Sequence, residues 1–245
     1  MRLGDVSTIR TSDVRGLVVT VMMTQKPDPQ RGAPIADDFL QYIRPWWRTV
    51  NRVGLQGVIL HDGLPREFID RATTPQVSFR QCSTGDLPIL HQRHFAVRDF
   101  LKQCDEDFVL VTDVSDVAFK RDPFEIMAEG SPDIRLYFGS EVKTIAQNRC
   151  LRTETEQQYG DVLYGDRRVM NPGIVGGRRC EVLAFLEKLT AEIERLQPNL
   201  LASDMCIVNR VLHSNYAESE VFTGAPLHSR FRGWEYSTLS AVMHK

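Results

Sequence analysis

The stretch FVLVTDVSD, Phe108 to Asp116, joins a short Val-rich run to a segment with two carboxylates. A short continuous apolar run with polar flanks is typical of a strand that is buried on both faces of a parallel sheet. Ligands of open parallel sheets bind beyond the carboxyl ends of the strands, where this order places Asp113 and Asp116. The stretch therefore predicts an α/β fold with a polar site after a central strand.

Strand-like and helix-like segments alternate on both sides of this run. The pattern predicts further strands at 17–24, 57–61, 77–79, 136–141 and 173–175, and helices at 36–53, 88–103, 180–196 and 203–213. Pro45 predicts a kink in the first helix or two shorter helices. His91 and His94 are expected at the surface. The alternation predicts one Rossmann-like α/β domain over residues 17–245, with a mostly parallel central sheet flanked by helices, after a polar segment over residues 1–16.

The composition is that of an ordinary globular chain. Of 245 residues, 42% are hydrophobic and 25% are charged, and the net charge of -2 lacks the basic excess of nucleic-acid-binding proteins. Five scattered cysteines without a CxxC pair argue against a zinc cluster and against a disulfide framework. No apolar run approaches the roughly 18 residues that a membrane span needs. We expect a cytoplasmic protein, with peripheral association at the inner face of the membrane as an alternative.

The segment that follows Thr112 offers hard oxygen ligands. Asp113, Ser115 and Asp116 supply two carboxylates and a hydroxyl, which suit Mg²⁺ or Mn²⁺. In the alternative interpretation both aspartates only form turns or cap the next helix.

Three later segments are candidates for the same site. Asn171-Pro172-Gly173 predicts a tight turn that forms the wall of a pocket, or else a plain strand-to-helix connection with Gly176-Gly177 in its turn. Ser203 is a candidate N-cap with Asp204 in the first helical turn, where capping alone also explains the carboxylate. His228 is expected in a late loop, where it is either a metal ligand or a surface residue.

Pairs of basic residues form another group of candidates. They are interpreted first as solvated surface and second as anion-binding sites. The pairs are Arg167-Arg168, Arg178-Arg179, and Arg230 with Arg232.

Taken in order, the acidic motif, the Asn-x-Gly turn, the Asp-bearing helix and the late histidine resemble GT-A-fold glycosyltransferases, above all the retaining enzymes of family 8. The sequence DVSDVAFKRDPF, residues 113–124, also looks like a variant DxxD-V-x-F-x-x-x-P-F signature of bacterial GT-A-like proteins. The resemblance extends over residues 17–230 and implies a GT-A-like fold. The two aspartates are separated by two residues where the family has one, and Met205 follows Asp204 where many members have glutamine.

The resemblance implies a metal-dependent hexosyltransferase. Such an enzyme moves a hexose from a nucleotide-sugar, here expected to be a UDP-sugar, to a glycan or lipid-linked acceptor with retention, in surface polysaccharide synthesis. It implies Mn²⁺ or Mg²⁺ on Asp113, Asp116 and His228. Asp204 and Glu141 are the candidate catalytic carboxylates. The implied donor-binding residues are Thr24, Gln25, Lys26, Asp113, Ser115, Asn171 and Gly173.

Two other functions fit part of the same pattern. A haloacid-dehalogenase-like phosphotransferase also carries an acidic motif after a central strand, although its second aspartate lies two positions on and here it lies three positions on. A non-catalytic sugar-nucleotide-binding module would bind the nucleotide without turnover.

Overall fold

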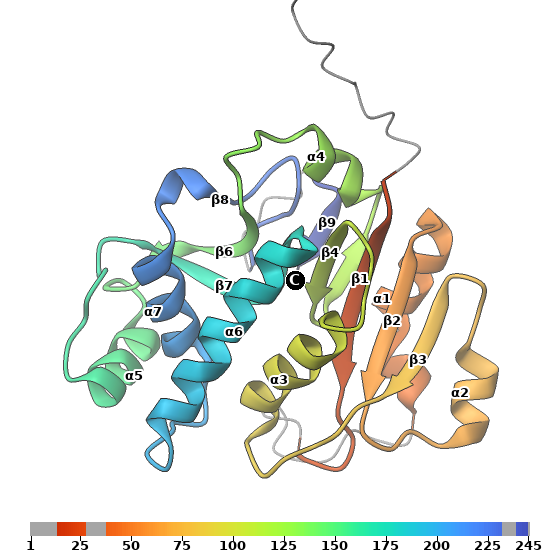
Figure 1. The fold of residues 1–245 in the computed structure, drawn as a ribbon, viewed down its shortest axis with the longest axis horizontal. Helices are drawn as coiled ribbons and strands as arrows, with labels where there is room; N and C mark the ends of the chain where they lie inside the picture. Colours follow the sequence, from red (N-terminus) through yellow and green to blue (C-terminus); the bar gives the residue numbers. More distant parts are fainter. Residues whose placement is uncertain (1–13, 28–37, 232–238, 245) are drawn as a thin grey trace, which may run out of the picture.

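A seven-stranded sheet in the order β3-β2-β1-β4-β7-β6-β8 runs through the centre of the computed structural model, which describes residues 14–27, 38–231 and 239–244 (Figure 1). Neighbouring strands are parallel except around β7, which is antiparallel to β4 and β6. The sheet is mostly parallel, as the sequence predicts. Its strands are β1 (Gly16–Met22), β2 (Gln56–His61), β3 (Val77–Gln81), β4 (Phe108–Thr112), β6 (Leu136–Thr144), β7 (Arg168–Arg178) and β8 (Val221–Phe222).

Helices cover both faces of the sheet, and each face has its own apolar core. One face packs against α3 (Ile89–Leu101), α5 (Arg149–Tyr159), α6 (Arg179–Leu196) and α7 (Met205–Asn215). The other packs against α1 (Phe39–Val53), α2 (Arg66–Ala72) and α4 (Pro123–Glu129). Burial on both faces explains why β1, β2 and β4 are continuous apolar runs without polar alternation. The expected single α/β domain is confirmed.

Helix α1 fastens the end of the central strand. It is a single helix that contains Pro45. Its N-cap is Asp38, whose carboxylate accepts a hydrogen bond from the Gln41 N–H, and its C-cap is Gly54. The predicted start at Ala36 lies outside the described residues. The indole of Trp46 is fully buried and donates a hydrogen bond of 2.9 Å to the Thr112 hydroxyl. This bond ties α1 to the last residue of β4, directly before the acidic segment.

Strand β7 is longer than the sequence predicts. It runs through Asn171-Pro172-Gly173, where a tight turn was expected, and on through Gly176-Gly177. The chain bulges here, because Phe138 pairs with Val175 while the next residue of β6, Gly139, pairs with Asn171. Proline has no N–H for a ladder, so a bulge is how a central strand accommodates it. The proline therefore locates the irregular part of β7 correctly, but the prediction of a tight turn there was wrong.

A second, two-stranded sheet pairs β5 (Val117–Phe119) with β9 (Val242–His244) in antiparallel fashion. Val117 lies opposite His244, so the end of the chain is brought back beside the acidic segment. The sequence did not predict this sheet. A short 3₁₀ turn, Glu218–Glu220, precedes β8.

Two global features complete the fold. All five cysteines are unbridged thiols. In the part of the chain that the structure describes, no helix is both long and apolar enough to span a bilayer.

Candidate functional site

The acidic segment begins at the carboxyl end of β4, as the sequence predicts. The Asp113 N–H donates a hydrogen bond of 3.0 Å to the Gly173 carbonyl oxygen, which holds the start of the segment against the bulge of β7. The Asp113 and Asp116 side chains are 31% and 25% exposed. The segment is therefore fixed by the sheet, with its carboxylates within reach of a ligand.

His244 joins these two aspartates. Its Nε2 lies 3.9 Å from Asp113 Oδ2 and 3.8 Å from Asp116 Oδ2, and one potential ligand atom of each residue lies within 4.8 Å of the others. The His244 side chain is 1% exposed, and neither of its ring nitrogens has a hydrogen-bond partner among the described residues. Asp116 Oδ1 is likewise buried without a partner there. Buried polar atoms without partners are costly, and a divalent cation between these groups would satisfy them, so the donor set fits a metal ion.

The electrostatics of the group also favour a cation. Burial, with the adjacent negative charge of Asp113, raises the pKa of Asp116 to about 7. Burial lowers the pKa of His244 to about 4, so the imidazole is neutral at pH 7 and keeps a lone pair for a ligand bond. Two crowded carboxylates beside a neutral imidazole form a set of oxygen and nitrogen donors that suits Mn²⁺.

Gly173 explains how β7 can approach this group so closely. A Cβ atom at this position would lie 2.4 Å from His244 Cε1 and 2.7 Å from Asp113 Oδ2. Any side chain would therefore displace the histidine or the carboxylate. Gly173 is required here by space, and its neighbour Asn171 accepts a hydrogen bond of 2.9 Å from the Gly173 N–H.

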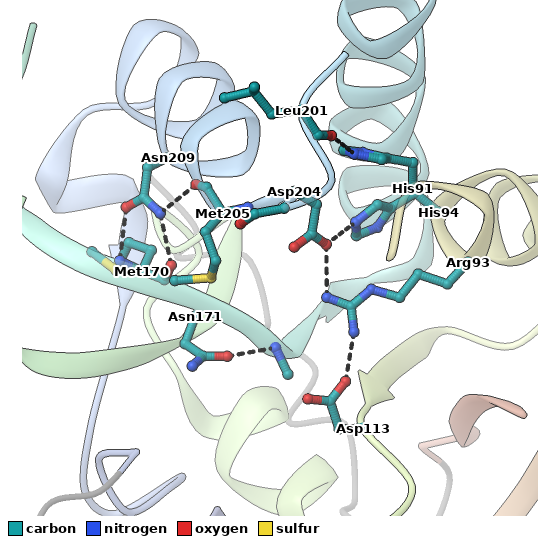
Figure 2. Close-up of polar contacts among 12 residues, drawn as sticks. His91, Arg93, His94, Asp113, Met170, Asn171, Leu201, Asp204, Met205 and Asn209 are labelled. Atoms are coloured by element: carbon teal, nitrogen blue, oxygen red, sulfur yellow. Dashed lines mark hydrogen bonds and ion pairs between the residues drawn. The ribbon is translucent and has the colours of Figure 1, made fainter. Parts of the chain in front are cut away.

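An ionic network links the acidic segment to α3 and to the start of α7 (Figure 2). Arg93 donates to Asp113 Oδ1 over 2.7 Å and to Asp204 Oδ2 over 2.8 Å. His94 Nε2 lies 2.7 Å from the same oxygen of Asp204. The carboxylates hold the pKa of Arg93 above its ordinary value, although burial acts to lower it. Arg93 therefore bridges two of the carboxylates that the sequence singles out.

Asp204 is 2% exposed, and helix capping does not explain its burial. It occupies the N-cap position of α7 but its side chain makes no capping bond, while Ser203 Oγ accepts from the Met205 N–H over 3.3 Å. Burial would raise the pKa of Asp204, but Arg93 and His94 hold it well below the ordinary range. The carboxylate is therefore an ionised group, and its position is set by α3.

His91 and His94 are not surface residues, and this prediction was wrong. His91 is fully buried and His94 is 6% exposed. His91 Nε2 lies 2.7 Å from the Leu201 carbonyl oxygen, which anchors the segment before α7 (Figure 2). His91 and His94 contact Leu201 and Asp204 in the segment that leads into α7, and these long-range contacts are invisible in the local pattern.

His228 does not join Asp113 and Asp116 in the structure. It is 1% exposed, so it is not a surface residue either. Its Nδ1 lies 2.9 Å from the Ser229 carbonyl oxygen, and its Nε2 lies 2.7 Å from the Phe138 carbonyl oxygen. The Gly224 N–H also points at Nε2, over 2.9 Å. Both ring nitrogens are engaged by the backbone, which leaves His228 with a structural role.

The loop Thr24 to Lys26 follows β1 at the same edge of the sheet. Asp62, which follows β2, accepts hydrogen bonds from the Thr24 and Gln25 N–H groups over 2.7 and 3.1 Å. The Lys26 ammonium donates to the carbonyl oxygens of Gly85 and Leu87. The loop is thus held in place by its neighbours, and Asp28-Pro29 beyond it lies outside the described residues.

The remaining predicted residues occupy less central positions. Ser115 lies between the two aspartates and is half-buried. Glu141 lies on β6 and accepts a hydrogen bond of 3.2 Å from Asn148, the N-cap of α5. The structure therefore places Asp113 beside Asp116 and Gly173, and Arg93 links Asp113 to Asp204.

The sequence pattern did not identify Arg93, His94 and His244 as residues of the candidate site. The four consecutive polar residues His91 to His94, in a helix with an apolar face, were a signal for the first two. For His244 the only signal was the short apolar run Ala241-Val242-Met243, typical of an edge strand.

Comparisons with known proteins place the fold. No family model matches the sequence, and no curated protein matches it. The apo form of the glycosyltransferase GlyE from Streptococcus pneumoniae TIGR4 aligns with a TM-score of 0.56 at 14% identity, over 94% of this chain and 54% of that chain. A second structure of GlyE gives a TM-score of 0.51 at 15% identity, over 86% and 45%. This chain spans about half the length of these structures. At such identities the likeness shows the fold, which is a glycosyltransferase fold.

Proposed function

We propose that this chain is a metal-dependent glycosyltransferase that moves a hexose from a UDP-sugar to a glycan or lipid-linked acceptor. The anomeric configuration is retained, and the product belongs to a surface polysaccharide. The proposed ligands of Mn²⁺ or Mg²⁺ are Asp113, Asp116 and His244.

One observation carries the proposal. His244 is buried between two carboxylates with both ring nitrogens unpartnered among the described residues. An isolated turn or a helix cap has no use for such a histidine. The position at the carboxyl edge of the sheet, beside the loop Thr24 to Lys26, is where an α/β fold binds a nucleotide. The glycosyltransferase fold of the structural neighbours is consistent with the same ligand.

When bound, the metal would neutralise the diphosphate as the glycosidic bond breaks. The chain's own residues supply the rest of the mechanism. The Thr24 to Lys26 loop positions the nucleotide, and Asn171 with Gly173 forms the wall next to the sugar. Asp204, which Arg93 and His94 keep ionised and fixed, stabilises positive charge that develops on the sugar ring. In the retaining route the acceptor hydroxyl attacks from the face that the diphosphate leaves, and a phosphate oxygen takes the proton.

The test measures release of UDP from UDP-glucose and UDP-galactose, with and without Mn²⁺. The native protein is expected to turn over one of them only with the metal. Asp116→Asn removes one metal ligand and is expected to lower the rate by about 100-fold or more. Asp70→Asn is the matched control, because Asp70 lies on α2 in an exposed ion pair with Arg66.

Other results would contradict the proposal. Turnover that is equal in EDTA, or equal in Asp116→Asn, would refute the metal role. Mn²⁺-dependent UDP binding without turnover of any nucleotide-sugar would indicate a binding module. Hydrolysis of a generic phosphate ester at the expense of UDP-sugar turnover would indicate a phosphotransferase.

A further inference from the structure

A large cavity lies between the edge strand β3 and helix α3 (Figure 1). Its volume is about 680 Å³, and it is open to solvent. Leu60 of β2 and Ala96 of α3, both buried, belong to its lining. The lining extends from Gln92 to Gln103, which corresponds to about 16 Å along the axis of α3. The cavity is therefore an elongated groove, with room for a chain of several units.

Gln92 presents an unused carboxamide to this groove. Its side chain belongs to the lining and is 7% exposed, yet it makes no hydrogen bond with any described residue. A Cβ atom at Gly85 would lie 2.9 Å from Gln92 Oε1, so the glycine leaves the space that the carboxamide occupies. Burial of an amide without a partner is costly, and a ligand in the groove would supply the partner.

The lining is rich in groups that both donate and accept hydrogen bonds. Four further amide and hydroxyl side chains of the lining make no hydrogen bond with any described residue: Gln81, Ser83, Thr84 and Gln103. The rings of Phe95 and Phe100 add apolar surface between them. A ligand hydroxyl also both donates and accepts, so amides and hydroxyls match it in either role.

The charges of the lining argue against a metal ion or a phosphate as the ligand. The carboxylate of Asp99 is already paired with Arg98 and Lys102, over 2.8 and 3.9 Å. Burial raises the pKa of the Cys82 thiol to about 11, so this group is uncharged at pH 7. Arg80 makes no ion pair with any described carboxylate, but a single exposed arginine is not a convergent anion site. The lining therefore fits an uncharged ligand with many hydroxyl groups.

The wall of the groove is held in place at both ends. The Cys82 N–H donates a hydrogen bond of 2.8 Å to the His61 carbonyl oxygen. The Lys26 ammonium donates to the carbonyl oxygens of Gly85 and Leu87. A preformed wall reduces the entropy that binding would cost. Through Lys26, the groove also adjoins the loop Thr24 to Lys26 of the candidate site.

We propose that this groove binds a neutral oligosaccharide. The carboxamides of Gln81, Gln92 and Gln103 bond its hydroxyl groups, and the rings of Phe95 and Phe100 pack against its apolar ring faces. A nucleobase would fill only one end of so long a groove. The bound glycan is the remote part of the acceptor, an assignment that rests on the proposed function, whereas the binding itself does not.

The test measures binding to a printed array of linear oligosaccharides built from glucose, galactose and N-acetylhexosamines. It is run in EDTA and without nucleotide, so the result does not depend on the donor site. Saturable binding of a neutral oligosaccharide is expected, and calorimetry with that oligosaccharide gives its Kd.

Variants locate this binding. Gln92→Leu keeps the size of the side chain and removes the amide, so it is expected to weaken binding about tenfold. Gln103→Ala, at an exposed position, is expected to weaken binding about threefold and serves if Gln92→Leu does not fold. Gln157→Leu is the matched control, because Gln157 is exposed on α5 and outside the lining.

Other outcomes would overturn the proposal. They are the absence of saturable binding to every neutral oligosaccharide of the array, and equal weakening by Gln157→Leu. Weaker UDP binding in Gln92→Leu without any glycan binding would assign the groove to the nucleotide instead. Asp116→Asn is expected to bind the oligosaccharide like the native protein, so failure of the proposed metal site and failure of this groove are separately visible.

Discussion

His228 and His244 both lie late in the chain and both are buried, yet their ring nitrogens are used in opposite ways. Those of His228 face the carbonyl oxygens of Ser229 and Phe138. Those of His244 have no partner among the described residues, and its Nε2 lies within 4 Å of two carboxylates. The same residue type therefore acts as a structural link in one place and as a candidate metal ligand in the other.

The difference teaches that the backbone around a histidine decides its role. Backbone groups of Gly224 and Ser229, with the Phe138 carbonyl of β6, contact both ring nitrogens of His228. Strand β9 satisfies its backbone by pairing with β5, so the imidazole of His244 is left for another ligand. Substitution of each histidine or of its partners tests this difference.

The largest effect is expected for His244→Ala. Loss of one direct ligand should lower Mn²⁺ affinity by about 100-fold, since even outer partners of metal ligands contribute tenfold to 100-fold. Isothermal titration calorimetry with Mn²⁺ in the presence of UDP measures this. An unchanged affinity would show that His244 is buried for packing alone.

A loss of stability is expected for His228→Ala. The variant leaves buried carbonyl groups without partners, which should lower the free energy of unfolding by about 2 kcal/mol in urea titrations. Mn²⁺ affinity of the folded variant should equal that of the native protein. An unchanged free energy of unfolding together with a loss of Mn²⁺ binding would contradict the structural role of His228.

A graded effect, smaller per pH unit than that of either substitution, is expected from pH. The pKa of Asp116 is about 7 in the folded protein against an ordinary value of 3.8. Because the folded state then holds a proton that the unfolded chain has lost, the metal-free protein should lose stability as pH rises from 3.8 to about 7. Mn²⁺ competes with this proton, so its affinity should fall about tenfold per pH unit below 7. Asp116→Asn should abolish both trends, and trends that persist in it would assign them to another group.

Much of the fold could be predicted from the sequence. Strands β1, β2 and β4 are confirmed, because burial on both faces leaves a continuous apolar run that local chemistry makes visible. Asp113 and Asp116 lie at the end of β4 for the same reason. The bulge of β7 could be located from Pro172, but its pairing to β4 and β6 depends on residues far along the chain.

The rest of the site depends on contacts that no local pattern contains. His94 is buried where the segment before α7 places Asp204 against α3, and the only local evidence was a polar residue on a helix. His244 comes to Asp116 through a pairing of two three-residue strands, more than 120 positions apart in the sequence. Short strands of this kind are stabilised by their partners, so their own sequence gives a weak signal.

The most direct test of His244 as a metal ligand is a pulsed electron spin echo spectrum of bound Mn²⁺ with UDP. We predict modulation from an imidazole nitrogen in the native protein, its loss in His244→Gln, and its retention in His228→Gln. Modulation that persists in His244→Gln and disappears in His228→Gln would contradict the assignment of His244. Absence of bound Mn²⁺ in the native protein would contradict the metal site as a whole.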